Sequence, residues 1–376
     1  MQSQESMNQS IIVYTGPGSS NSWVWLADFL ERKEFLNTDF ISDPGMIPDT
    51  GVDVIMIPGG DAFGIAEAFG ADGFRKISDM IERGSGYVGI CAGAYLPLRS
   101  SIPPLSEFNL IDSRIANISS SLPDSIVDQE KYSVRYGCSF IFHPARGPVI
   151  LTGDAEIVAP LYGGPSLMPS TNERALLSFK GLMDETEVLV DREVCMRTMI
   201  GRAACIEGMY GKGRVVCSSA HLEHPDFPEA NAYFSQLLRA FPSGGDGRIA
   251  RDNSGTDKGD ARRIIADLRV LANALDSHSW KIGVKYWESE KLLFYIDAVR
   301  KRIGKKGESI DRIPSGSMHH FELAKNDLRA LQDDDDERIL QSAVASLSQG
   351  TSLFLTDHFS RLNEELSQNR ADDQRK

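Results

Sequence analysis

In the stretch YVGICAGAYLP, residues 87–97, an apolar run ends at a cysteine flanked by glycines. Two similar runs precede it, IIVYTG at 11–16 and GVDVIMIPGG at 51–60, and each also ends in glycine. Segments near 21–33 and 63–83 lie between the runs and have a helical pattern. Alternation of buried strands with helices is typical of a mostly parallel, doubly wound α/β sheet with helices on both faces.

The second half of the chain follows other patterns. Two strand-like runs flank the glycines of YGKG, which predicts an antiparallel hairpin within 203–221. The segment 242–259 is rich in Gly, Ser and Asp, as linkers are. Beyond it, apolar residues recur at alternating spacings of four and three, which predicts amphipathic helices. We therefore predict an α/β domain over 1–241, a linker over 242–259, and an all-α domain of about four helices over 260–376.

Composition and charge exclude several classes of protein. The formal net charge is -13 over 376 residues, which is unlike the basic surface of a nucleic-acid-binding protein. The basic run RKRIGKKG at 300–307 fits the last turns of a helix, where cations complement the helix dipole. No apolar run is long enough to span a bilayer, and the N-terminus lacks the pattern of a signal peptide. We expect a cytoplasmic protein with neither nucleic acid nor membrane as a partner.

The cysteines indicate neither a metal site nor a disulfide framework. There are five of them, widely spaced, and none forms a CxxC pair. We therefore expect no metal and no cofactor.

Cys91 lies where a strand would pass into a helix, and Gly89 and Gly93 flank it at the spacing of a nucleophile elbow. The N-terminus of the following helix would present N–H groups and a positive dipole end, and both favour a thiolate over a thiol. Free cysteines are also commonly buried and inert, so this motif alone leaves both interpretations open.

Backbone N–H groups near the cysteine are candidates to stabilise a tetrahedral oxyanion. The amide of Ala92 directly follows the nucleophile. The turn that ends the neighbouring strand would supply a second donor, at Gly60 or Asp61, and Gly59 would line the same site. The run GPGSSNS at 16–22 borders the carboxyl end of the first strand, where it could hold an anion at a helix N-terminus.

A histidine and a carboxylate follow a later strand-like run. SSAHLEHP, residues 218–225, contains His221 and, two residues on, Glu223. Along an extended segment, side chains at positions i and i+2 face the same way. The carboxylate would then hold the imidazole in the tautomer that accepts a proton from the cysteine. We predict Cys91, His221 and Glu223 as a catalytic triad in that chain order.

With these motifs, the first ~240 residues resemble the class I glutamine amidotransferase-like superfamily, and within it most closely the biotin-protein-ligase N-terminal domain family. The matching stretches are VIMIPGGDA, GYVGICAGAYL, LYGGPSL and EGMYGKGRVVCSSAHLEHP. The resemblance implies a flavodoxin-like sheet that carries the triad. It also implies backbone oxyanion donors at Gly60 and Ala92, and a pocket lined by Tyr162, Gly163 and Gly164.

The resemblance implies a cysteine-nucleophile amide hydrolase or amidotransferase-like protein that acts on a small-molecule amide or acyl substrate. Glutamine-hydrolysing members carry GxCxGxQ at the elbow, and here Tyr95 takes the last position. The C-terminal helices would mediate self-association or dock a protein partner. Two alternatives remain open: a cysteine hydrolase with no partner, and a non-catalytic ligand-binding or regulatory module. A blocked approach to Cys91, or a triad out of register, would favour the non-catalytic module.

Overall fold

The fold is described from a computed structural model, for residues 9–116, 145–188, 190–245, 255–282, 285–303, 312–334 and 336–373. Its strands are β1 (Ile11–Tyr14), β2 (Thr38–Ile41), β3 (Val54–Ile57), β4 (Gly86–Ile90), β5 (Arg114–Ile115), β6 (Ala145–Thr152), β7 (Glu156–Leu161), β8 (Leu167–Met168), β9 (Arg174–Leu182), β10 (Glu187–Val188), β11 (Ala203–Tyr210), β12 (Gly213–Ser218), β13 (Gly255–Asp257), β14 (Ser279–Ile282), β15 (Lys285–Glu288) and β16 (Arg312–Pro314). Its helices are α2 (Trp23–Arg32), α3 (Ala62–Arg83), α5 (Arg192–Met199), α6 (Pro228–Arg239), α7 (Lys258–Ala274), α8 (Ser289–Ile303), α9 (Ser315–Ala330) and α10 (Glu337–Asp373), with short 3-10 turns η2 (Pro44–Met46), η3 (Cys91–Ala94) and η4 (Leu105–Glu107).

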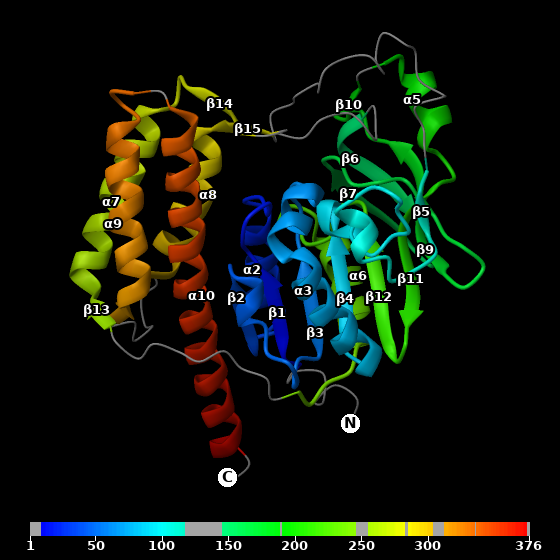
Figure 1. Ribbon diagram of the computed structural model, residues 1–376, viewed down its shortest axis with the longest axis horizontal. Helices are drawn as coiled ribbons and strands as arrows, with labels where there is room; N and C mark the ends of the chain where they lie inside the picture. Colours follow the sequence, from blue (N-terminus) through cyan, green and yellow to red (C-terminus); the bar gives the residue numbers. More distant parts are fainter. Residues whose placement is uncertain are drawn as a thin grey trace.

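The predicted doubly wound sheet is confirmed (Figure 1). Its parallel half has the strand order β2-β1-β3-β4-β12, the 2-1-3-4-5 order of flavodoxin-like folds. The predicted hairpin is also confirmed, because β11 pairs antiparallel with β12. Beyond it the sheet continues through β9, β6 and β10, an antiparallel half that was not predicted. In this strand order, ligands bind at the carboxyl ends of the parallel strands.

Alternate residues of each parallel strand point to opposite faces of the sheet. In β1, Ile11 and Val13 belong to one core cluster, and Ile12 and Tyr14 belong to the other. The cluster that contains Val13 also contains α2 and α6, whereas α3 supplies the cluster on the opposite face. Strands buried on both faces explain the nearly continuous apolar runs from which the sheet was predicted.

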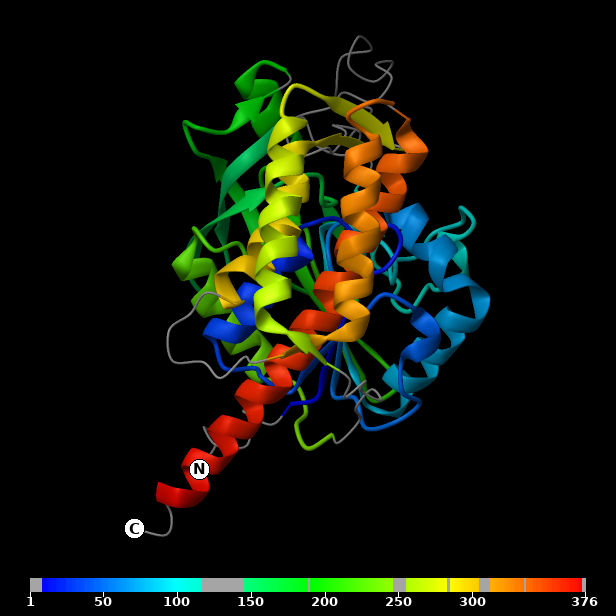
Figure 2. The same cartoon turned by 90° about the vertical axis from the view of Figure 1, so that its left-hand side faces the viewer.

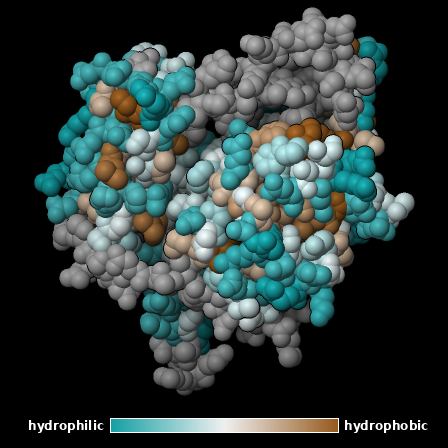
Figure 3. Space-filling model, viewed as in Figure 1, coloured by the Kyte–Doolittle hydropathy of each residue, from teal (hydrophilic) through white to brown (hydrophobic). Residues whose placement is uncertain are grey.

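The helical C-terminal part is confirmed: α7, α8, α9 and α10 pack together, and α10 lies against the edge strand β2 (Figures 1 and 2). Two short strand pairs, β13 with β16 and β14 with β15, were not predicted. Residues of these helices share one core cluster with α2 and α6. Apolar residues on the face of this part that Figure 3 shows lie in separate patches among hydrophilic ones.

The predicted domain boundaries stay predictions. The last residues of the predicted linker form β13 and the start of α7, and residues 246–254 lie outside the described part. Cys138 also lies outside it. No helix in the described ranges combines the length and the apolar character needed to cross a membrane.

Helix α10 covers the open edge of the sheet. The Thr356 hydroxyl accepts a hydrogen bond from the Phe40 backbone N–H of β2, at 2.9 Å, and donates one to the Phe40 carbonyl, at 3.3 Å. One turn and two turns earlier, Ser352 donates to the Thr15 hydroxyl at 2.7 Å and Ser348 to the Thr15 carbonyl at 2.9 Å. An uncovered edge strand would present unpaired backbone groups to other chains, so α10 protects β2 from edge-to-edge association.

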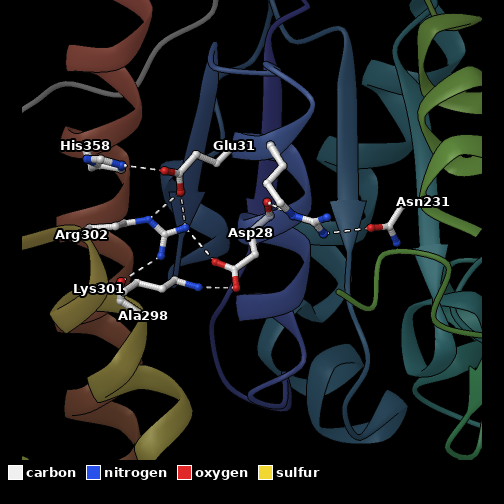
Figure 4. Close-up of polar contacts among 8 residues, drawn as sticks. Asp28, Glu31, Asn231, Ala298, Lys301, Arg302 and His358 are labelled. Carbon is white, nitrogen blue, oxygen red and sulfur yellow. Dashed lines mark hydrogen bonds and ion pairs between the residues drawn. The ribbon is translucent and has the colours of Figure 1, made fainter. Parts of the chain in front are cut away.

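A buried ion-pair cluster fastens the helical part to α2 (Figure 4). Arg302 of α8 is only 1% exposed, and its guanidinium contacts Asp28 at 2.8 Å and Glu31 at 2.7 Å. Lys301 also pairs with Asp28, and His358 of α10 lies 3.4 Å from Glu31. The basic run does end a helix, as predicted, but its buried arginine bridges two parts of the chain.

Candidate active site

Cys91 stands at a strained turn directly after β4. Its φ is +52°, in the left-handed region that residues other than glycine rarely adopt. Both flanking glycines are needed for close backbone packing: a Cβ at Gly93 would lie 2.1 Å from the Ile57 carbonyl oxygen, and one at Gly89 2.3 Å from that of Gly93. The Tyr87 hydroxyl holds the turn by donating to the Gly93 carbonyl at 2.7 Å. The strained cysteine and the close glycines are features of a nucleophile elbow, but the short 3-10 turn η3 follows Cys91 in place of the predicted helix.

His221 and Glu223 follow β12, the strand that pairs in parallel with β4. His221 Nδ1 lies 2.7 Å from Glu223 Oε1, and the two side chains are 3% and 0% exposed. The imidazole also forms a side-chain hydrogen bond with Cys91, and because Nδ1 faces Glu223, this contact falls to Nε2. Burial lowers the pKa of His221, but the charge of Glu223 and the bond to Cys91 outweigh it and raise the pKa to about 10.

The segment that carries His221 is held from α6 and α2. Asn231 of α6 donates to the carbonyls of Leu222, at 2.8 Å, and His224, at 3.0 Å. The Asn231 oxygen in turn accepts a hydrogen bond from Arg32 of α2 at 2.9 Å (Figure 4). Arg302 of the helical part contacts α2, and hydrogen bonds through Arg32 and Asn231 connect α2 with the loop that carries His221.

The pocket at Cys91 is small, about 20 Å³, close to the space of a single water. Its lining residues are Ser20, Asn21, Ser22, Trp25, Gly59, Gly60, Cys91, Tyr162 and His221. The ring of Trp25 stands edge-on to His221, with centroids 5.4 Å apart, and Tyr162 lies 5.6 Å from the same ring. These two aromatic side chains close the site, and Cys91 is only 4% exposed.

Of the predicted residues outside the triad, the pocket includes Gly59, Gly60 and Tyr162. The others lie nearby but not in its wall. Asp61 caps α3 by accepting from the N–H groups of Phe63 and Gly64, and Ala92 is buried beside Cys91. Behind Tyr162, the carbonyl of Gly163 accepts from the Tyr95 hydroxyl at 3.0 Å. Gly164 packs against Ser219, where a Cβ would lie 2.0 Å from the backbone oxygen.

Ser20, Asn21, Ser22 and Trp25 line the pocket but were not predicted as site residues. They belong to the loop after β1 and the first turn of α2, at the same sheet edge as Cys91. The signal available was the position of GPGSSNS at the carboxyl end of the first strand. Trp25 carries no such signal, because a tryptophan in an apolar helical pattern usually packs in the core.

The other described cysteines lack this setting. Cys195, Cys205 and Cys217 are buried. Burial raises the pKa of Cys195 to about 11 and that of Cys205 to about 12, and it raises that of Cys217 well above the ordinary value. A thiol with a raised pKa is a poor nucleophile at neutral pH. Of the four described cysteines, only Cys91 lines the pocket with a histidine.

Comparison with known proteins finds one family, described as biotin-protein ligase, N terminal, which matches residues 9–101. No curated protein matches the chain. Similar solved structures include a glutamine amidotransferase, 15% identical with a TM-score of 0.39, which covers 61% of this chain and 98% of its own. A cytoplasmic protein from Salmonella typhimurium is 9% identical with a TM-score of 0.38, covering 62% of this chain and 99% of its own.

The structural likenesses are weak, with TM-scores below 0.4. The family match contains Cys91 and the turn at Gly59 and Gly60, whereas His221 and Glu223 lie outside it. The resemblance that the motifs indicated is confirmed for this stretch: residues 9–101 match the biotin-protein-ligase N-terminal family.

Proposed function

We propose that this protein is a cysteine-nucleophile hydrolase or amidotransferase-like enzyme that acts on a small amide or related acyl compound. One observation carries the proposal: Glu223 holds Nδ1 of His221, so that Nε2 faces the sulfur of Cys91. This is the arrangement in which a histidine activates a nucleophile while a third group orients the base. The strained backbone of Cys91 supports it further, because such strain clusters at active sites.

In the proposed reaction, the Cys91 proton already resides on Nε2 of His221 as a thiolate–imidazolium pair, and the thiolate attacks the acyl carbon. The amides of Gly60 and Ala92 stabilise the tetrahedral oxyanion. Protonated His221 then gives its proton to the leaving amine as the C–N bond breaks. Water attacks the thioester with His221 as base, which releases the acid and restores the thiolate–imidazolium pair. Tyr95, in place of the usual glutamine, favours a substrate other than free glutamine.

The first test is the pH dependence of Cys91 alkylation by iodoacetamide, read by peptide mass mapping of the full chain. We expect an apparent pKa well below the reference of about 8.5 for a free cysteine. His221→Ala should raise it, because the imidazolium that stabilises the thiolate is lost. Cys195, Cys205 and Cys217 serve as internal controls, since burial raises their pKa values.

His224→Ala is the matched control for the loop. His224 lies three residues from His221 and packs on Trp25 with ring centroids 4.3 Å apart, but it does not line the pocket. Burial and the charge of His221 lower its pKa to about 4, so it carries no charge at neutral pH. Equal effects of the two alanine variants on the alkylation of Cys91 would contradict the proposed role of His221.

A non-catalytic ligand-binding or regulatory module is the second candidate, and the small pocket favours it. A space of about 20 Å³ admits no substrate unless Trp25 or Tyr162 moves. Under this alternative, Cys91 stays unreactive toward iodoacetamide across the pH range in the folded protein and reacts only after denaturation. Self-association or docking of a protein partner through the helical part stays a prediction, and analytical ultracentrifugation of the full chain tests the first of these.

A further inference from the structure

A cavity of about 510 Å³, separate from the Cys91 pocket, lies where the α/β sheet meets the helical part. It is bounded by the loops after β1 and β2, the N-terminus of α3, and side chains of α8 and α10. Its volume lies in the range of small-molecule binding sites. We propose that it is a second ligand site, which takes a primary amine with an apolar body and a hydroxyl group at the far end.

The charge of the cavity wall selects a cation. Asp43 and Asp61 both line it, and the described part of the chain contributes no lysine, arginine or histidine to its wall. Oδ1 of Asp43 accepts from the Gly45 N–H at 2.8 Å, and Oδ1 of Asp61 accepts from that of Phe63 at 3.0 Å. One oxygen of each carboxylate thus binds the backbone, which fixes the side chain and leaves the other oxygen for a ligand. GPGSSNS was expected to hold an anion. On the side that faces this cavity, the two carboxylates make anion binding unfavourable.

The inner end of the cavity offers a buried hydroxyl. Tyr295 of α8 is 1% exposed, and its Oη lies near Ser348 and Trp23 without a hydrogen bond of good geometry. Buried hydroxyl groups without a partner are costly, so a ligand hydroxyl at this point would satisfy it. Pro17 and Val344 line the cavity with apolar surface. The wall therefore combines an exposed carboxylate of Asp43, apolar surface and the buried hydroxyl of Tyr295.

The cavity is a site of its own because backbone hydrogen bonds separate it from Cys91. The Asp61 N–H donates to the Gly18 carbonyl at 2.7 Å, and the Ser20 N–H donates to the Gly59 carbonyl at 2.9 Å. Residues 16–19 face the larger cavity, whereas residues 20–22 face the Cys91 pocket. One short run of chain thus forms a wall of both spaces. The proposal does not depend on catalysis by Cys91.

Three compounds with one skeleton and different charges test the proposal: tyramine, its neutral alcohol analogue tyrosol, and the anion 4-hydroxyphenylacetate. Isothermal titration with the full chain should show tyramine binding about tenfold tighter than tyrosol, with no binding of the anion. Asp43→Asn should weaken tyramine about fivefold or more, because asparagine keeps the backbone contact but loses the charge. Glu67→Gln, an exposed position on α3 outside the cavity, should have no effect.

Two further variants place the ligand within the cavity. Ala345→Phe, at an exposed position on α10 that lines the cavity, should abolish tyramine binding by filling the space without disturbing the core. Tyr295→Phe should weaken tyramine but leave the affinity for phenethylamine, which lacks the hydroxyl, unchanged. Absence of tyramine binding overturns the proposal, as does equal affinity for tyramine and the anion, or an affinity for tyramine that Ala345→Phe and Asp43→Asn leave unchanged.

Discussion

Replacing Glu223 with glutamine removes one negative charge from the buried pair with His221 and keeps its shape. The carboxylate is fully buried, and its Oε2 finds no hydrogen-bond partner among the described residues. The imidazole of His221 is therefore the group that stabilises its negative charge. The stability of the pair therefore depends on whether His221 is protonated. We expect Glu223→Gln to cost stability at low pH and to cost little or nothing at high pH.

The size of the effect follows from the pKa of His221. Burial lowers this pKa, but the charge of Glu223 is the largest of the contributions that raise it, to about 10 from 6.5. A rise of that size corresponds to about 5 kcal/mol at 1.36 kcal/mol per pKa unit. A group with a raised folded pKa contributes fully below its unfolded pKa, and the contribution disappears as pH rises through the folded value. The contribution is therefore complete below pH 6.5 and lost by about pH 10.

The measurement is urea unfolding of the wild type and Glu223→Gln at about pH 6 and about pH 9.5. Cys91 also raises the pKa of His221, so Glu223 supplies only part of the total, and we expect a loss on the order of 2–4 kcal/mol at about pH 6. Near pH 9.5 the difference should shrink to below about 1 kcal/mol. A difference of the same size at both pH values would refute the claim that His221 is charged because of Glu223.

Two further predictions concern the junction between the sheet and the helical part. Arg302→Met should lower the free energy of unfolding by about 3 kcal/mol, because it removes the buried cation that contacts both Asp28 and Glu31 and leaves these partly buried carboxylates with Lys301 and His358 alone, whereas Arg300→Met, at an exposed position of the same helix, should cost about 1 kcal/mol or less. If thermal or urea denaturation showed equal losses of stability for Arg302→Met and Arg300→Met, the ion-pair cluster would not stabilise the fold more than an exposed ion pair does. Thr356→Val should cost about 1–3 kcal/mol by leaving the Phe40 amide of β2 unsatisfied. Thr351→Val removes a buried hydroxyl that has no hydrogen-bond partner among the described residues, so it should be neutral or stabilising, and a loss as large as that of Thr356→Val would contradict this account.

The parallel strands were predictable because burial on both faces leaves an apolar run in the local sequence, and Cys91, Gly93 and His221 stand at the ends of such runs. Strand β2 was not predictable in this way, since its sequence TDFI is half polar. It is buried because α10, some 300 residues later, covers its edge, and no local pattern reports a contact of that kind. Trp25 was missed for a related reason: only the fold turns a helical tryptophan toward His221.

The loop at residues 16–22 faces two spaces at once, which links their occupants thermodynamically. A ligand that shifts Gly18 against Asp61 in the larger cavity displaces the same chain that carries Ser20 and Asn21 to Cys91. Linkage is reciprocal, so the factor by which an amine in the cavity changes the affinity for a compound at Cys91 must equal the factor in the other direction. Occupancy of either space would then depend on the concentration of the compound that binds the other.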